Sequence, residues 1–286
     1  MKVPKIVVLA GLFAAVFAVW PLMGASSVSA EQSGSRQAEQ KVTENRSEEE
    51  IKEKIEEKVE QFRRDADAFF EQGGLEDLEK VIELYEKILE ENPGDFEATW
   101  KIARACRGYG DLVKRKKVSG WEDLCAEYGK KGMKYAKKAI EMAPDKPNGY
   151  YYYGLCVGTY SDGVGLFTAL REGLKDKTRN SLEKAYEIDK YFEEGGPIVA
   201  LGRFWQVVPW PYTDKEKAMQ YYREFQKTKY FDTPGGVNAH VYMAEILIDQ
   251  WGSEPEQEAR ELLKEAIELT EDPYWKKRAR DLLDQL

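Results

Sequence analysis

The side chains that carry out most enzymatic chemistry are scarce in this chain. Its 286 residues contain a single histidine, His240, which falls where the helical pattern calls for a packing side chain. The motifs G-x-S-x-G and H-E-x-x-H are absent, as are a phosphate-binding Gly-rich loop and the acidic spacing of a calcium loop. Nucleophilic catalysis needs an oriented base beside its nucleophile, and nothing here supplies that pair. We therefore predict no enzymatic activity, no catalytic residue, no metal and no cofactor.

The three cysteines, Cys106, Cys125 and Cys156, leave two interpretations open. Their number is odd and none has C-x-x-C spacing. Cys106 and Cys125 fall on consecutive helices that would lie antiparallel, so an oxidising compartment would allow a disulfide between them. The alternative is that all three are small buried thiols.

Four other side chains have the chemistry of a binding surface. Tyr151, Arg203, Gln206 and Glu245 take corresponding positions on three helical stretches, where we expect them to face the same side. Tyrosine, arginine and glutamine combine contact area with directional hydrogen bonds, which is why such residues line protein-binding surfaces. The alternative is that Tyr151 and Arg203 only cover neighbouring apolar surface and leave their polar tips in water.

The elements that must position these residues recur along the chain. Five amphipathic stretches end in nearly the same way, at residues 88–93, 139–144, 185–190, 225–230 and 266–271, and a second helical stretch precedes each one. One helix pair cannot bury its own apolar face, so a period of this kind indicates stacked pairs. A last amphipathic stretch, 273–286, has the place of a cap. The pattern predicts an all-α, right-handed superhelical solenoid of about five helix pairs, with insertions between helices and a C-terminal capping helix.

The residues within each pair resemble the tetratricopeptide repeat (TPR). Small or apolar triplets fall at the same offsets in the second helices, and small residues there let one helix approach the next closely: Val81/Tyr85/Ile88, Gly132/Ala136/Ala139, Thr178/Leu182/Ala185, Ala218/Tyr222/Phe225 and Ala259/Leu263/Ala266. The units are longer than the usual repeat of about 34 residues. The extra length falls between the two helices of a unit.

Four short stretches carry a finer resemblance. They are Ala-Arg-Ala at 103–105, Tyr-Tyr-Tyr-Gly at 151–154, Ala-Leu-Gly-Arg at 200–203 and Val-Pro-Trp-Pro at 208–211. Together they resemble the T-component associated with tripartite ATP-independent periplasmic transporters. That resemblance implies a transporter accessory subunit whose partner is a periplasmic solute-binding protein. Members of that group are lipoproteins, and this chain departs from them in having no cysteine near residue 30.

The N-terminus has the pattern of a secretory signal peptide. Lys2 and Lys5 precede an apolar run, and Val28-Ser29-Ala30 offers small residues for cleavage after Ala30. The alternative is an uncleaved membrane anchor, since about 20 apolar residues can span a bilayer. The polar residues 31–46 predict a disordered spacer. A capping box at Ser47 then predicts the start of the repeat domain, 47–286.

Two connecting segments are unusual for their apolar content. The insertion 161–175 carries Gly163 and Gly165 at its start and several large apolar residues, which suggest either a short helix hinged over one end of a groove or fixed packing between units. The Pro209-Trp210-Pro211-Tyr212 turn is rigid and aromatic, and it suits either an exposed contact or a plug between repeats.

Charge and architecture together define the function we expect. The net charge of −9 excludes a nucleic-acid-binding protein of the usual basic kind. Repeat scaffolds bind by the shape of a groove and need no chemistry. We therefore expect an extracytoplasmic scaffold that binds a protein partner or a small hydrophobic ligand in its concave groove. The alternative is a structural homo-oligomer that has no separate ligand.

Overall fold

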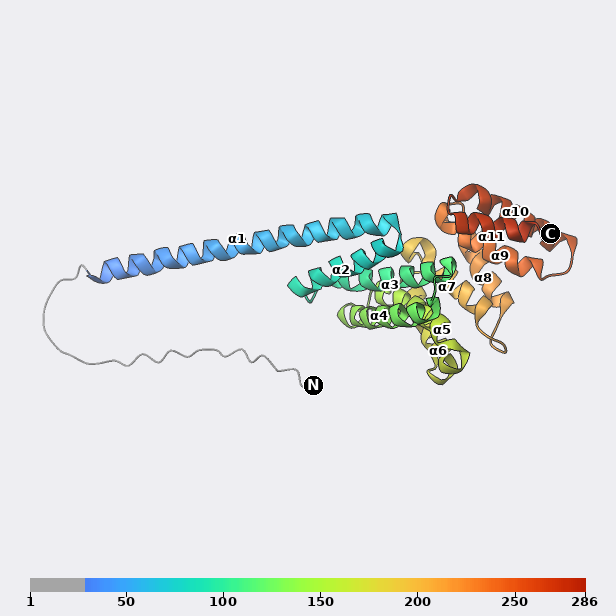
Figure 1. Ribbon diagram of the computed structural model, residues 1–286, viewed down its shortest axis with the longest axis horizontal. Coiled ribbons are helices and arrows are strands. Elements are labelled where there is room, and N and C mark those ends of the chain that lie inside the picture. The colour runs from blue at the N-terminus through green and yellow to red at the C-terminus, as the bar shows by residue number, and fades with distance from the viewer. Residues whose placement is uncertain (1–28) are drawn as a thin grey trace. The chain divides into compact units, whose positions relative to one another are not determined.

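The computed structural model describes the backbone of residues 29–286 and the side chains of residues 49–286. Within that range the chain forms helices and no strand, which confirms the predicted all-α class. The predicted signal peptide lies outside the described residues except for Ser29 and Ala30. In chain order the elements are α1 (Ser29–Gln72), α2 (Leu75–Glu91), α3 (Phe96–Lys116), α4 (Trp121–Met142), α5 (Pro147–Arg171), α6 (Leu174–Asp189), α7 (Phe192–Val207), α8 (Lys215–Gln226), a 3₁₀ turn (Pro234–Gly236), α9 (Val237–Ile248), α10 (Ser253–Leu269) and α11 (Pro273–Leu283) (Figure 1).

The chain divides into two compact units, residues 1–54 and residues 55–286. In the first unit the described residues belong to one continuous helix, the beginning of α1. The structure has residues 31–46, where the composition predicts a disordered spacer, as helix, and Ser47 lies inside this helix instead of capping it. Half of residues 31–46 are Glu, Gln or Arg and none is Pro, a composition that favours helix. Their low apolar content argues against a packed core, which is a separate matter from secondary structure.

The second unit is the predicted stack of helix pairs. The end of α1 pairs with α2, and α3/α4, α5/α6, α7/α8 and α9/α10 follow, with α11 as the cap. From α2 onward each helix packs on its neighbours in the chain, and the end of α1 packs on the core that α2 and α3 share. The first helices of successive pairs also contact one another, α3 with α5, α5 with α7, α7 with α9, and α9 with α11. This double pattern of contacts is that of an α-solenoid, in which each unit closes the core of the one before it.

The apolar periodicity of each helix determines which of its faces is buried. In α2 the buried positions are Leu78, Val81, Ile82, Tyr85 and Ile88, a single stripe at the spacing of a helical face. Fully burying one large side chain of this kind contributes about 1.5–3 kcal/mol of transfer free energy. In α1 the apolar face begins to pack against the core only at Val59, and Ile51 remains 58% exposed.

Small residues bring the second helices against the next unit. Gly129, Gly132, Ala136 and Ala139 lie on one buried face of α4. A Cβ atom placed on Gly129 would lie 2.5 Å from the backbone nitrogen of Tyr160 in α5. One placed on Gly132 would lie 2.4 Å from the sulfur of Cys156. The predicted role of the small triplets in close helix approach is therefore confirmed in α4.

The insertion after Tyr160 continues α5 for little more than one turn, bends at Gly165 and then forms a short helical segment that ends at Arg171. Gly163 packs on the N-terminal turn of α4, where an added Cβ would lie 2.3 Å from the carbonyl oxygen of Glu122. Gly165 has φ 73°, a conformation that favours glycine, and there the helix changes direction. Leu174, at the start of α6, is buried. The insertion is thus fixed at both ends, but Leu166, Phe167 and Leu170 between them are exposed and do not fill a gap between units.

Candidate functional site: the inner face of the first helices

The first helices present a shared polar face, which we call the inner face. Its charged and aromatic side chains come from four helices: Arg107, Asp111 and Arg115 of α3, Arg203 and Gln206 of α7, Tyr242 and Glu245 of α9, and Tyr274 and Arg278 of α11. Each α3 member is four residues from the next, so all three lie on one side of that helix. The contacts between the first helices bring this side toward α7, α9 and α11.

Glu245 is the hub of the inner face. Its Oε2 accepts hydrogen bonds from Arg203 Nη1 at 3.0 Å and from Gln206 Nε2 at 3.1 Å. Its Oε1 accepts from Arg278 Nε at 2.8 Å, and Arg278 Nη2 donates to the same oxygen. The Glu245 side chain is 18% exposed, whereas both arginine side chains are 30% exposed. One largely covered carboxylate therefore holds two guanidinium groups that still reach water.

Tyr242 lies at the centre of these charges. The Arg203 guanidinium carbon is 4.2 Å from the centroid of the Tyr242 ring, a favourable cation–π distance. Burial raises the pKa of the Tyr242 hydroxyl, while the charges of Arg203, Arg278 and Arg115 act in the opposite direction. Asp111 also acts on this pKa and raises it. Side chains of α3, α7 and α11 therefore converge electrostatically on one residue of α9.

Arg115 links the second helix pair, α3/α4, to the cap α11. The guanidinium carbon of Arg115 lies 4.6 Å from the ring centroid of Tyr274 and 5.0 Å from that of Trp275. Arg115 Nη1 is 3.5 Å from a carboxylate oxygen of Asp272, and Arg115 Nε is 2.7 Å from Asp111. The repeat offsets do not mark Arg115 as an inner-face residue. The signal that could have found it is the Arg-Asp-Arg spacing of four residues in α3.

The structure brings together three of the four predicted groove residues. Arg203, Gln206 and Glu245 are joined by the hydrogen bonds described above. Tyr151 lies elsewhere, with its ring edge-on to Phe192 at a centroid distance of 5.6 Å. A Cβ on Gly196 would lie 2.5 Å from the Tyr151 hydroxyl oxygen, so Tyr151 packs against the start of α7. Burial raises the pKa of this hydroxyl, and Tyr151 belongs to the aromatic packing of α3, α5 and α7.

His240 is part of the core, where the sequence pattern places it. Its side chain is fully buried, its ring stacks on Phe231 at 3.8 Å, and its Nδ1 is 3.1 Å from the carbonyl oxygen of Gly236. Burial lowers the pKa of the imidazole. Across the described residues, no group of three or more His, Cys, Asp or Glu side chains is placed to hold a metal ion.

The Cys106–Cys125 disulfide that the sequence allows is not formed in this structure. All three thiols are reduced and buried. The cause is the register of α3 and α4, because Cys125 donates to the carbonyl oxygen of Gly110, one turn beyond Cys106. Cys106 instead lies near Cys156 across Gly132. Burial raises the pKa of Cys125 to about 11 and that of Cys156 to about 12, so both are kept as thiols.

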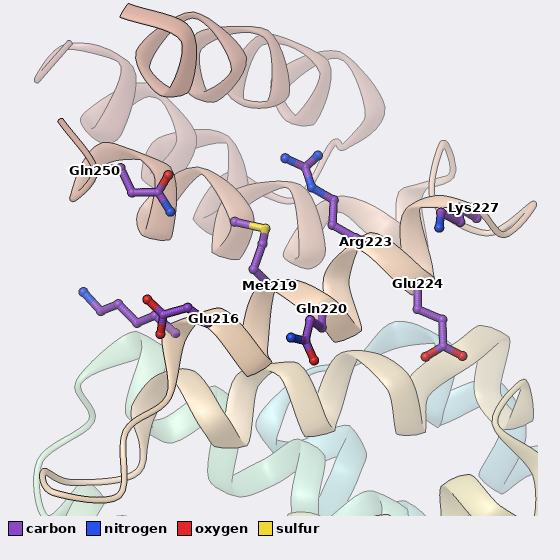
Figure 2. Close-up of a pocket in the computed structure, with 8 residues that line it drawn as sticks. Glu216, Met219, Gln220, Arg223, Glu224, Lys227 and Gln250 are labelled. Carbon is purple, nitrogen blue, oxygen red and sulfur yellow. The ribbon is translucent and has the colours of Figure 1, made fainter. Parts of the chain in front are cut away.

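A pocket of about 540 Å³ opens on α8, away from the predicted groove residues. Figure 2 shows Met219, Gln220, Arg223 and Glu224 along this helix, with Gln250 opposite. Its charged groups already have partners, since Arg223 pairs with Glu258 and Glu224 accepts from Tyr186 and Lys190. The pocket is shallow and open, so we assign no site to it.

The solved structures bear out the repeat fold. A thermophilic TPR protein of Thermus thermophilus superposes with a TM-score of 0.57 at 16% sequence identity, over 78% of this chain and 98% of its own. At 16% identity this similarity supports the fold and no shared function. The helices of residues 29–286 do not include one with the length and apolar content to cross a bilayer.

The sequence comparisons lead to a different family from the transporter T-component, which none of them shows. Regulator of microtubule dynamics protein 1 of mouse is 29% identical over 129 residues, which is 45% of this chain and 35% of the mouse protein. The bovine protein of the same name has the same identity over 129 residues, 34% of its length. The matched part thus spans about a third of these relatives. The model of the family described as regulator of microtubule dynamics protein 1-3 matches residues 62–205, half of the chain, and the chain belongs to that family.

Proposed function

We propose that this protein is a scaffold whose inner face binds a segment of a partner protein. TPR-like solenoids act by presenting such a face, and they need no catalytic group. The observation that carries the proposal is the Glu245 hub, where two arginines and a glutamine from α7 and α11 converge on a carboxylate of α9, and both arginines stay partly exposed. A buried structural ion pair would have no need of such exposure.

The charge of the inner face favours a peptide over a small apolar ligand. Four guanidinium groups, those of Arg107, Arg115, Arg203 and Arg278, line a face of a chain whose net charge is −9. Guanidinium forks bind carboxylates and carbonyl oxygens, which a peptide segment supplies along its whole length. An apolar ligand would cover the remaining N–H donors of these groups without supplying acceptors, at a cost in free energy.

The names of the mouse and bovine relatives state a role in microtubule dynamics for those proteins. The segment that matches this chain covers about a third of each of them. We propose only protein binding for this chain. The family model covers inner-face residues that α3 and α7 supply, including Arg107, Arg115 and Arg203.

Site-specific photo-crosslinking tests the proposal without depending on a change in stability. A photoreactive amino acid replaces Arg107 on the inner face in one variant and the exposed Lys184 on α6 in the control variant. In cells that produce the protein, we expect the Arg107 position to give a discrete adduct with another protein and the Lys184 position to give none. Equal labelling from both positions, or no adduct from Arg107, would refute binding at the inner face. An adduct between two copies of this chain would favour the homo-oligomer instead.

A further inference from the structure

The turns inside successive helix pairs form a continuous edge of the solenoid. We call residues 114–120, 161–175 and 207–214 the turn edge. Its first two segments are joined by an ion pair between Lys114 Nζ and Asp162 Oδ2 at 2.7 Å. The second and third are joined by Lys175, whose Nζ lies 3.6 Å from the ring centroid of Tyr212. Residues separated by nearly a hundred positions in sequence thus belong to one surface.

Large apolar side chains project from this edge into solvent. Phe167 is 80% exposed and Trp210 is 88% exposed, and Leu166 and Leu170 beside Phe167 are also exposed. Leu166 and Leu170 lie one turn apart, so they share one side of the short helix that follows Gly165. Soluble proteins rarely expose apolar side chains in such a group unless the group binds something.

The backbone around these side chains is held in place, so their exposure is built into the fold. The amide of Tyr212 donates to the carbonyl oxygen of Pro209 at 3.0 Å, and the amide of Asp214 donates to that of Trp205 at 3.0 Å. These bonds fix the turn on which Trp210 stands. On the other segment, the packing of Gly163 on α4 and the burial of Leu174 fix both ends of the helix that carries Phe167.

The charges beside these apolar tips favour an anionic surface. Residues 114–117 are four consecutive basic residues, and Lys116 and Lys117 are exposed without an ion pair to any described residue. The acidic residues of the insertion are already paired, Asp162 with Lys114, Glu172 with Arg171, and Asp176 with Lys175 and Arg179. Glu122 and Asp123 stand in the first turn of α4, where the helix dipole holds negative charge.

We propose that the turn edge docks on the surface of a lipid bilayer that carries anionic headgroups. Trp210, Phe167 and Leu170 enter the interface, where aromatic and aliphatic side chains partition favourably, while Lys116 and Lys117 contact the headgroups. Apolar side chains on the tips of separate turns can enter a soft headgroup layer together. A second copy of the chain or a rigid protein would need matching hollows. This proposal does not depend on peptide binding by the inner face.

A position-specific fluorescence measurement tests the docking in the full chain. Because the native thiols are buried, a cysteine introduced by Phe167→Cys accepts an environment-sensitive label selectively. The control is Tyr191→Cys, which places the label on the opposite edge, in the turn between α6 and α7. The vesicles are phosphatidylcholine with one third phosphatidylglycerol, with or without quenchers on the acyl chains. We expect a blue shift and acyl-chain quenching at position 167 and neither effect at position 191.

Two further variants separate the contributions to docking. Trp210→Ser should raise the lipid concentration that gives half of the maximal signal at position 167 about tenfold, since a large apolar group leaves the interface. The double variant Lys116→Gln/Lys117→Gln should raise that lipid concentration by about an order of magnitude on vesicles with phosphatidylglycerol. On vesicles of phosphatidylcholine alone, the double variant and the unmodified lysines should give the same value. The proposal fails if position 167 gives no signal, or if positions 167 and 191 respond alike. A response at 167 that follows protein concentration without vesicles would identify a second copy as the occupant and would also overturn it.

Discussion

Two glycines in adjacent helices allow a sharp test of how closely α4 and α5 approach. Gly129 in α4 and Gly158 in α5 both lie within helices, so alanine at either position gains about 0.5–1 kcal/mol from helix propensity. They differ in surroundings. A Cβ at Gly158 would meet nothing within 4 Å, whereas one at Gly129 would lie 2.5 Å from the nitrogen and 2.7 Å from the Cα of Tyr160. The backbone of α5 cannot yield without separating the two helices.

The expected effects therefore have opposite signs. Overpacking of this kind typically costs about 1–3 kcal/mol, and a backbone clash belongs at the upper end, so Gly129→Ala should lower the free energy of unfolding by about 2 kcal/mol net. Gly158→Ala should raise it by about 0.5–1 kcal/mol. The melting temperature should fall by about 4–8 °C for the first variant and rise by about 1–4 °C for the second. Denaturant unfolding followed by far-UV circular dichroism measures both. A Gly129→Ala protein as stable as the wild type would show that α4 and α5 are farther apart than described.

Three other perturbations follow from the inner face and the core. Glu245→Gln should lower the free energy of unfolding by about 2 kcal/mol, because two partly covered guanidiniums lose a charged acceptor. The control Glu256→Gln, in the exposed pair with Arg260, should lower it by less than about 0.5 kcal/mol. Equal losses for the two variants in denaturant unfolding would show that Glu245 has no special role in stability. Burial lowers the pKa of His240 below its ordinary 6.5, so just below pH 6.5 the unfolded chain binds more protons than the folded chain. The free energy of unfolding should therefore fall there as the pH decreases. A pH profile of the denaturation midpoint that His240→Gln leaves unchanged would contradict this. The native protein should release no thiol signal with Ellman's reagent, and the denatured unreduced protein should release all 3; a single thiol on denaturation would reveal a disulfide.

The parts of the fold that depend on local pattern could be predicted from the sequence. Apolar spacing and the recurrent helix endings are local signals, and they placed the helix pairs and the cap correctly. The solenoid follows from them, because stacked pairs are the way such faces become buried. The extension of α1 to Ser29 was missed because a polar, Pro-free segment satisfies the composition of a spacer and of an exposed helix equally well.

The candidate site divides in a similar way. Arg203, Gln206 and Glu245 were found because equivalent offsets on adjacent first helices place side chains side by side. Tyr151 was assigned to the same face by the same rule, but Phe192, the first residue of α7 and outside the repeat pattern, packs against it. Arg115 was missed because its contact with α11 joins the second helix pair to the cap, across the pairs that lie between them in sequence. That contact depends on how the units accumulate curvature, which no local spacing encodes.

The hydrogen-bonding capacity of the inner face specifies the chemistry of what can bind there. An arginine has five N–H donors and no acceptor. Among the contacts of the described residues, Arg203 uses Nη1 for Glu245 and places its guanidinium over Tyr242, and its remaining donors have no protein acceptor. Both oxygens of Glu245 and the side-chain carbonyl of Gln206 are already occupied as acceptors. The face therefore has donors to offer and few acceptors. A partner that presents carboxylates or backbone carbonyl oxygens would complete it, whereas a lysine-rich partner would meet four guanidiniums and be repelled.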